Sequence, residues 1–128
     1  MFGEWEHFEG GPFKRNEDRV HVTLSLRSVI LLNKGALEML GQPEAVTLHF
    51  NKRKSMIGVK EAKTGDTGAF PLVDKGKVSH RLINAGSFCQ HHKIKPSRTL
   101  AFYDVQRQNG YLALDLNRVT EIGLERKR

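Results

Sequence analysis

The sequence predicts a mainly β domain with two short helices, an α+β arrangement built from two similar halves. Apolar and polar residues alternate along several short segments, which is typical of half-buried strands. Two segments with helical spacing each follow directly after a strand pattern, and the order strand, strand, helix, hairpin occurs twice. With 128 residues, the chain is long enough for one compact core but too short for two large ones.

The first half begins with the clearest strand pattern in the chain. Apolar residues occupy every second position from Val20 to Leu26, which predicts a strand with one buried face. The apolar run Val29–Leu32 predicts a second strand, buried on both faces. Asn33 offers an N-cap for a short helix over Lys34–Leu40 that ends at Gly41. The remaining elements of this half are a hairpin of Val46–Phe50 and Met56–Val59 across the polar turn Asn51–Lys54.

A polar linker over residues 61–68 precedes the second half, in which the same order returns. It predicts strands over Phe70–Val73 and Val78–Ile83, a helix from its cap Asn84 to about His92, and a hairpin of Leu100–Val105 and Tyr111–Leu116 across Asn109–Gly110.

The two halves also share residues at the junction of strand and helix. The string Asn33-Lys34-Gly35-Ala36-Leu37 aligns with Asn84-Ala85-Gly86-Ser87-Phe88, 51 positions later. A constant offset of this kind predicts an internal duplication, with residues 19–64 and 65–128 as repeats of one compact domain. We expect the repeats to pair about a pseudo-two-fold axis, in a monomer or a homodimer.

Residues 1–18 form a separate acidic leader, in which aromatic residues alternate with acids before Gly10-Gly11-Pro12 breaks the pattern. Large rings seldom stay free in water, so the leader is interpreted either as a strap that docks on the domain or on a protein partner, or as a partly disordered segment. The aromatic residues in question are Phe2, Trp5, Phe8 and Phe13.

Charge is distributed unevenly along the chain, whose formal net charge is +7. The leader has five acidic and two basic residues, whereas residues 19–128 have 19 basic and 9 acidic residues. Such an excess of positive charge predicts a polyanionic partner, usually nucleic acid, although a solvated basic surface without a partner gives the same composition.

No apolar stretch is long enough for a membrane span, and the acidic N-terminus differs from a signal peptide. The sequence therefore predicts a cytoplasmic protein that does not enter membranes. Cys89 is the single cysteine, so no internal disulfide can form.

Several segments of the first half resemble the AbrB, MazE and SpoVT group of small DNA-binding domains. They are Val29-Ile30-Leu31-Leu32-Asn33-Lys34, Leu40-Gly41, Val46-Thr47-Leu48 and Ile57-Gly58-Val59-Lys60. The resemblance implies a barrel-like fold in which two copies exchange hairpins, either as a dimer or within one chain, and a role as a transcription regulator or antitoxin. Barrels of the double-psi kind are related and serve other functions.

If the protein binds duplex DNA, cationic side chains at the ends of elements can reach phosphates without disturbing the core. Arginine also matches phosphate and guanine edges in a forked geometry. The candidates are Arg27, Lys34, Lys52, Arg53, Lys54, Arg81, Lys93, Lys95 and Arg98, to which the terminal Arg126-Lys127-Arg128 can add non-specific contacts.

The sequence predicts neither an enzyme nor a cofactor or metal site, because it lacks the common phosphate-loop, nucleophile-elbow and zinc-helix motifs. Cys89, His91 and His92 have poor spacing for zinc, since His91 points away from the face that the other two share on a helix. Asp104 and Asp115 could face each other across a hairpin. The leading hypothesis is a prokaryotic-type, AbrB-like DNA-binding regulator, and the alternative is a non-catalytic adaptor or antitoxin-like module that binds protein.

Overall fold

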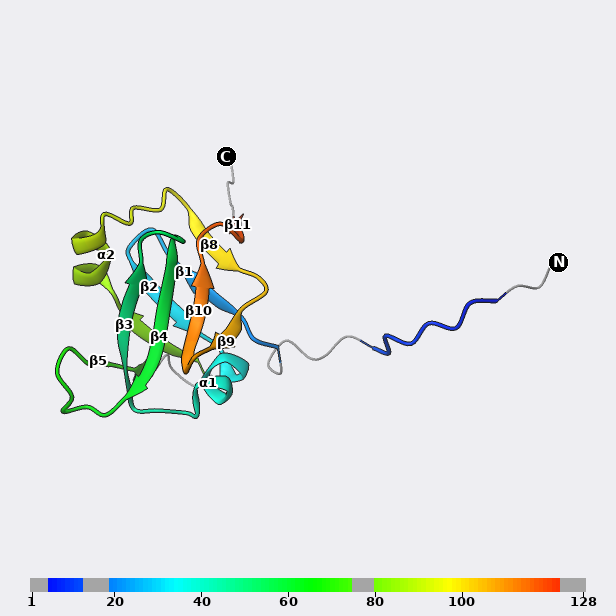
Figure 1. Ribbon diagram of the computed structural model, residues 1–128, viewed down its shortest axis with the longest axis horizontal. Helices are drawn as coiled ribbons and strands as arrows, with labels where there is room; N and C mark the ends of the chain where they lie inside the picture. Colours follow the sequence, from blue (N-terminus) through cyan, green and yellow to red (C-terminus); the bar gives the residue numbers. More distant parts are fainter. Residues whose placement is uncertain (1–4, 13–18, 75–79, 123–128) are drawn as a thin grey trace.

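The computed structural model describes residues 5–12, 19–74 and 80–122. The described strands form two antiparallel sheets (Figure 1). Sheet A has the order β11 (Val119–Ile122), β8 (Thr99–Phe102), β1 (Val22–Leu24), β2 (Val29–Leu32), β7 (Arg81–Asn84) and β6 (Val73–Asp74). Sheet B has the order β5 (Phe70–Pro71), β3 (Ala45–Asn51), β4 (Met56–Ala62), β10 (Tyr111–Asp115) and β9 (Gln106–Gln108).

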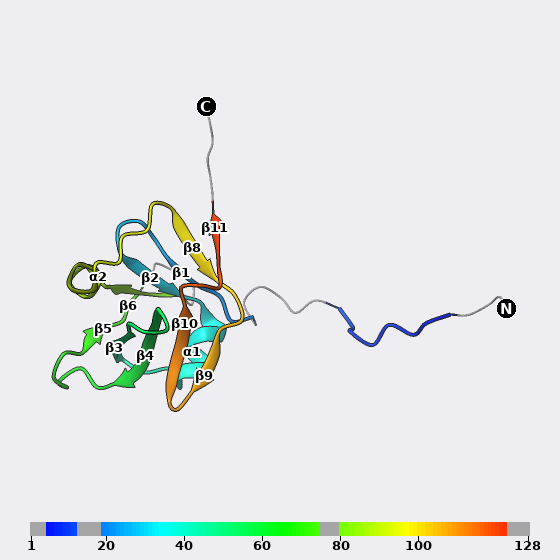
Figure 2. The ribbon, with the colours of Figure 1, turned by 45° about the horizontal axis from the view of Figure 1, so that its top comes forward.

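Two short helices, α1 (Lys34–Leu40) and α2 (Gly86–His92), lie at opposite ends of the molecule (Figures 1 and 2). The prediction of a mainly β fold with two short helices is therefore confirmed. One core joins both sheets and both helices, because their inward-facing apolar side chains pack together and leave water. Its fully buried members include Leu24, Ile30, Leu32, Leu40, Val46, Ile57, Val59, Ile83, Leu112 and Leu114.

The expected closed barrel does not form from the described strands. Sheet A has β11 and β6 as its edges, and sheet B has β5 and β9. The strand predicted over Leu100–Val105 is interrupted at Asp104, which has a left-handed backbone with φ 60°. As a result β8 pairs with β1 in sheet A, whereas β9 pairs with β10 in sheet B. One continuous strand could have joined the two sheets, but the bend divides it between them.

The first strand is shorter than its alternation predicts. Val22 and Leu24 are fully buried, but Leu26 is 58% exposed and lies in the turn after β1. The Ser25 hydroxyl accepts hydrogen bonds from the backbone N–H groups of Arg27 and Val29, both at 3.2 Å, and so closes the turn before Leu26 can continue the strand. In β2, Ile30 and Leu32 are buried while the two alternate residues are only half-buried, so burial on both faces was wrong.

Helix α1 begins and ends where predicted. The Asn33 side chain accepts a 2.9 Å hydrogen bond from the Ala36 N–H, and Gly41 ends the helix in the left-handed conformation with φ 89°. The predicted cap of the second helix was wrong. Asn84 is exposed and still belongs to β7, where it pairs with Val29, and the N-cap is Ala85, which makes no side-chain cap bond.

The first hairpin occurs, with its connection at Lys52–Ser55. The turn at Asn109–Gly110 also occurs, but it joins β10 to β9, so the prediction of Leu100–Val105 as the partner strand was wrong. The sequence did not predict β11, which pairs with β8 at the edge of sheet A. In sheet A, β2 and β7 pair antiparallel with Leu31 opposite Leu82, the residue 51 positions later. The sequence separation of these two paired residues is therefore the same as the offset between the two similar sequence strings.

The described part of the leader, residues 5–12, contains no helix or strand and extends away from the sheets (Figures 1 and 2). Trp5 is 93% exposed and Phe8 is 78% exposed. The other two leader aromatics, Phe2 and Phe13, lie outside the described residues. No helix in the described part of the chain is long and apolar enough to cross a membrane.

Candidate nucleic-acid interface

The antiparallel pairing of β2 and β7 defines the two ends of the molecule. Val29 at the start of β2 lies opposite Asn84 at the end of β7, whereas Leu32 lies opposite Arg81. The β1–β2 turn and the start of α2 are therefore at one end of sheet A. The start of α1 and the start of β7 are at the other.

The tip of the β3–β4 hairpin lies at the same end as α2 (Figure 1). Phe50, near the end of β3, contacts the ring of His92 with a centroid distance of 4.8 Å and that of Phe88 with a distance of 6.4 Å. This aromatic cluster fixes the last turn of α2 against the hairpin. It also brings residues 52–54 close to the segment that leads from α2 to β8.

Seven of the nine predicted cationic residues thus lie at one end of the molecule, which we call the basic end. They come from three separate parts of the chain: the β1–β2 turn, the β3–β4 tip and the connection from α2 to β8. The basic end is defined by Arg27, Lys52, Arg53, Lys54, Lys93, Lys95 and Arg98.

The other two predicted residues, Lys34 and Arg81, lie together at the opposite end, where both line one surface depression. Arg81 forms an ion pair with Asp74, with 2.9 Å between Nε and Oδ1. The length of β2 and β7 separates these two cations from the basic end, so they do not belong to it.

Side chains at the basic end are largely available to a ligand. All seven are exposed to solvent. Arg98 has a long ion pair with Glu121, at 3.9 Å. Within the described part of the chain, the three cationic side chains of the hairpin tip form no ion pair. Their charges are therefore not neutralised by neighbouring carboxylates.

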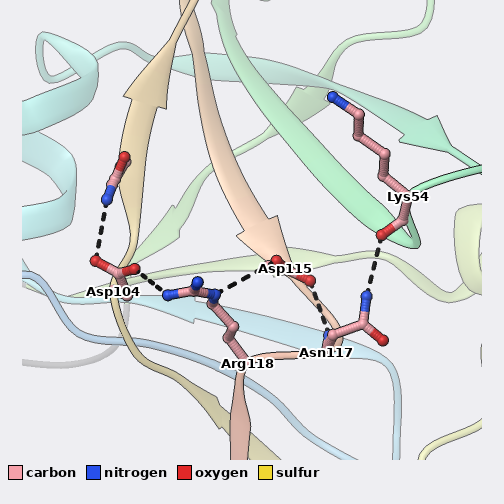
Figure 3. A network of polar contacts seen from close by, with 6 residues as sticks. Lys54, Asp104, Asp115, Asn117 and Arg118 are labelled. Atoms are coloured by element: carbon pink, nitrogen blue, oxygen red, sulfur yellow. Dashed lines mark hydrogen bonds and ion pairs between the residues drawn. The ribbon is translucent and has the colours of Figure 1, made fainter.

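Polar contacts hold the backbone of the hairpin tip in place (Figure 3). The Asn51 side chain accepts a 3.0 Å hydrogen bond from the Lys54 N–H, and the Asn117 side-chain amide donates to the Lys54 carbonyl at 3.2 Å. Leu116 also donates its N–H to the Ser55 carbonyl at 3.0 Å. The tip is thereby anchored to the chain that follows β10, so its cations project from a fixed base.

The two carboxylates that the sequence placed across a hairpin converge on one guanidinium (Figure 3). Arg118 Nη1 lies 2.5 Å from Asp104 Oδ2, and its Nε lies 3.9 Å from Asp115 Oδ2. Asp115 also accepts from the Asn117 N–H at 2.9 Å. Both acids are therefore engaged in holding the connections after β8 and β10.

Positive charge at the basic end also affects the titration of His92. The pKa of His92 is lowered, first by burial of the ring, then by the neighbouring His91 and by Lys52. Burial lowers a histidine pKa because the charged form loses hydration, and nearby cations act in the same direction.

Replacing Lys52 with glutamine is expected to raise the pKa of His92 towards the ordinary histidine value, since one repelling charge is removed. Replacing Lys34 with glutamine at the other end removes the same charge and serves as the control. The pKa is measured from the pH dependence of the His92 ring protons in NMR spectra. Equal shifts in the two variants would contradict the proximity of the tip to α2.

The end of the molecule opposite the basic end has a different charge. Glu44, Glu61 and Asp66 line one depression there with a single lysine, Lys63. Hydrogen bonds from Thr64 lower the pKa of Glu44, with a smaller contribution from Lys63. This depression therefore has more acidic than basic residues, in contrast to the basic end.

Cys89 is fully buried in the core beneath α2. Burial raises the pKa of its thiol, an effect that the Ser28 hydroxyl partly opposes. A thiol of this kind stays protonated at neutral pH and behaves as a small apolar side chain.

The rings of His91 and His92 contact each other edge to face at 4.7 Å. The described residues contain no group of three histidine, cysteine or acidic side chains placed to hold a metal ion.

Sequence reasoning missed one further feature, a groove on the outer face of sheet B. Its volume is about 310 Å³, and His49, Gly58 and Tyr111 lie along it. These residues occupy outward positions of β3, β4 and β10, so period-two counting on each strand could have placed them on one face. The order of the strands in the sheet, which brings β10 beside β4, was needed to bring them together.

Comparisons of the chain with models of protein families, with curated proteins and with solved structures found no match.

Proposed function

We propose that this protein binds nucleic acid, with duplex DNA as the first candidate, through the cations of the basic end. The observation that carries the proposal is that seven exposed cationic residues from three separate segments gather at one end, where the three cations of the hairpin tip form no ion pair with any residue that the structure describes. Phosphate groups that bind there release condensed counterions, which supplies most of the affinity of a sequence-independent contact.

The main test removes two charges from the hairpin tip by changing Arg53 and Lys54 together to alanine. Each lost phosphate contact lowers the slope of log K against log salt by about 0.9, so the slope is expected to decrease by about 2. Duplex affinity should fall while the melting temperature changes little, because both side chains are exposed. Fluorescence anisotropy with a labelled duplex at several salt concentrations provides the measurement.

A matched control changes Lys34 and Lys63 together to alanine, which removes the same charge from the opposite end. For this variant, the slope of log K against log salt should be nearly the same as for the original protein. If both double variants lose the same slope, binding depends on net charge alone and the assignment to the basic end is wrong.

An internal duplication is part of the same proposal, and the topology supports it. Each sheet contains one neighbouring pair of strands that hold the same place in the order of the two halves, β2 with β7 and β4 with β10. In the first of these pairs, Leu31 faces its own counterpart Leu82. Two repeats related by a pseudo-two-fold axis account for this arrangement. A regulator related to the AbrB group is the kind of protein that this organisation favours.

The alternative function, a module that binds another protein, is favoured by the exposure of Trp5 and Phe8 on the leader. Exposed aromatic anchors are typical of segments that become buried in a partner. Deleting residues 1–18 separates the two functions. It should preserve or strengthen duplex binding, because it removes net negative charge. The same deletion should abolish capture of a protein partner if the leader is the docking peptide.

A further inference from the structure

The outer face of sheet B carries a stacking platform next to the basic end. Antiparallel pairing places Tyr111 of β10 beside Gln108 of β9, while Gly58 of β4 lies opposite His49 of β3. The groove described above runs across these strands and reaches the hairpin tip, since Asn51 and Lys54 also line it. A volume of about 310 Å³ is at the lower end of the range of pockets that hold small ligands.

The ring of Tyr111 is held in a defined position. A Cβ atom added to Gly58 would lie 3.0 Å from Tyr111 Cδ1, so the ring covers the bare backbone of this glycine. The ring of His49 contacts Tyr111 at an interplanar angle of 78° and a centroid distance of 4.9 Å. The His49 Nε2 lies 2.8 Å from the Thr47 hydroxyl, which orients the imidazole. Tyr111 therefore has little freedom to collapse onto a ligand or move away from it.

The groove combines this aromatic ring with groups that suit a nucleotide. The Lys60 ammonium lies over the Tyr111 ring, 5.6 Å from its centre, and Lys54 lines the groove. Burial, followed by the charge of Lys60, lowers the pKa of His49, which favours the neutral form of its ring. The amide side chains of Asn51, Gln108 and Asn109 supply both donors and acceptors, as the edges of bases require.

We propose that the groove binds an unpaired base of a single-stranded nucleic acid, with the base stacked on Tyr111 and the adjoining phosphates next to Lys54 and Lys60. This inference rests on the proposed function and names its substrate class: nucleic acid with an unpaired segment that starts at the basic end. Every base has a π-face, so a stacking site of this kind binds with little sequence preference. In a duplex the bases are already stacked and cannot enter the groove.

The experiment compares a labelled single-stranded oligothymidylate of about 15 nucleotides, a length that covers the usual site sizes, with a duplex of the same length. Changing Tyr111 to leucine keeps an apolar cover over Gly58 but removes the stacking surface. Loss of one stacked base is expected to weaken single-strand binding by about ten-fold or more. Duplex affinity should stay within about two-fold of the original value, because the phosphate contacts remain. Changing Tyr111 to phenylalanine should restore single-strand binding, since the π-face returns.

Tyr103 provides the matched control, as it is 53% exposed and lies outside the groove. Changing Tyr103 to leucine should leave both affinities unchanged. A second measurement uses the unaltered protein, so it does not depend on how well the Tyr111 variant folds: the ring protons of Tyr111 should shift upfield in NMR spectra when the single strand is added. A stacked base produces this shift through its ring current.

If the Tyr111 signals do not move at saturation, or if the leucine variant binds the single strand as tightly as the original protein, the inference is wrong. In that case the duplex result at the hairpin tip still stands, because it depends on the charges of Arg53 and Lys54 and not on the ring of Tyr111. If instead the double variant of Arg53 and Lys54 keeps the full salt slope, the proposed function fails regardless of Tyr111.

Discussion

Replacing Asn33 with alanine is expected to lower the free energy of unfolding by about 3 kcal/mol, since a helix cap and the partners of further buried hydrogen bonds are lost together. Asn33 is 4% exposed. Its Oδ1 accepts from the N–H groups of Ala36 and His21, at 2.9 and 3.0 Å, and its Nδ2 donates to the Arg19 carbonyl at 2.5 Å. The Asn33 side chain therefore caps α1 and also holds the segment before β1 against the start of this helix.

The matched control for this change is Asn84, the counterpart in the second half. Asn84 is exposed at the end of β7 and does not cap α2, so its replacement by alanine should change the free energy of unfolding by no more than about 0.5 kcal/mol. Chemical denaturation followed by circular dichroism measures both values. Similar losses at the two positions would show that the cap is not what stabilises the first half.

Replacing Gly35 with alanine should also destabilise the protein, by about 1–3 kcal/mol, as overpacked positions do. A Cβ atom at this position would lie 2.2 Å from the carbonyl oxygen of Arg19 and 2.7 Å from its carbonyl carbon. Both atoms belong to the backbone, so no rotamer change relieves the contact. The segment over residues 19–21 would have to move away, which would also break the bonds that Asn33 makes with it.

Gly86 is the control for Gly35, because it stands at the equivalent position of the second string. A Cβ atom on Gly86 would meet nothing within 4 Å. Alanine there should stabilise the protein by about 0.4–1 kcal/mol, chiefly because the unfolded chain loses freedom. Thermal unfolding of the two variants measures whether the melting temperature falls for the Gly35 variant and rises for the Gly86 variant. A stabilised Gly35 variant would mean that the approach of the Arg19 backbone is not a constraint.

These paired variants also show how far the sequence alone predicts the structure. The strings at Asn33 and Asn84 look alike, and the sequence predicted that both residues cap helices. Only Asn33 does so. The difference arises because Asn84 stays in the β ladder opposite Val29 and the Ala85 N–H donates to the Ser28 carbonyl, so the helix begins later. A local motif cannot reveal a pairing with a strand that lies far away in the sequence.

Similar reasons explain the other differences. Leu26 continues the alternation of the first strand, but the hydrogen bonds of Ser25 turn the chain first. Asp104 adopts a left-handed backbone within a segment that otherwise resembles one strand. The carboxylate of Asp104 is bound by Arg118, which lies 14 residues later, so a tertiary contact accompanies the bend.

For the candidate site, the sequence supplied the residues but not their grouping. All nine cations were identified at element ends, and seven of them lie at one end of the molecule. Lys34 and Arg81 do not, because antiparallel strands carry the starts of β7 and α1 to the opposite end. The groove around Tyr111 required the order of the strands in sheet B, which no local pattern contains.

By itself the sequence determined the class of fold, the first helix with its cap, both hairpin turns and the excess of positive charge, since periodicity, capping and charge are local properties of the chain. Tertiary structure alone decided which strands are neighbours, and therefore that the sheets stay open, that the cations divide between two ends and that Tyr111 lies over Gly58. These outcomes depend on contacts between residues far apart in the sequence, whose free energy is gained only when the whole core packs.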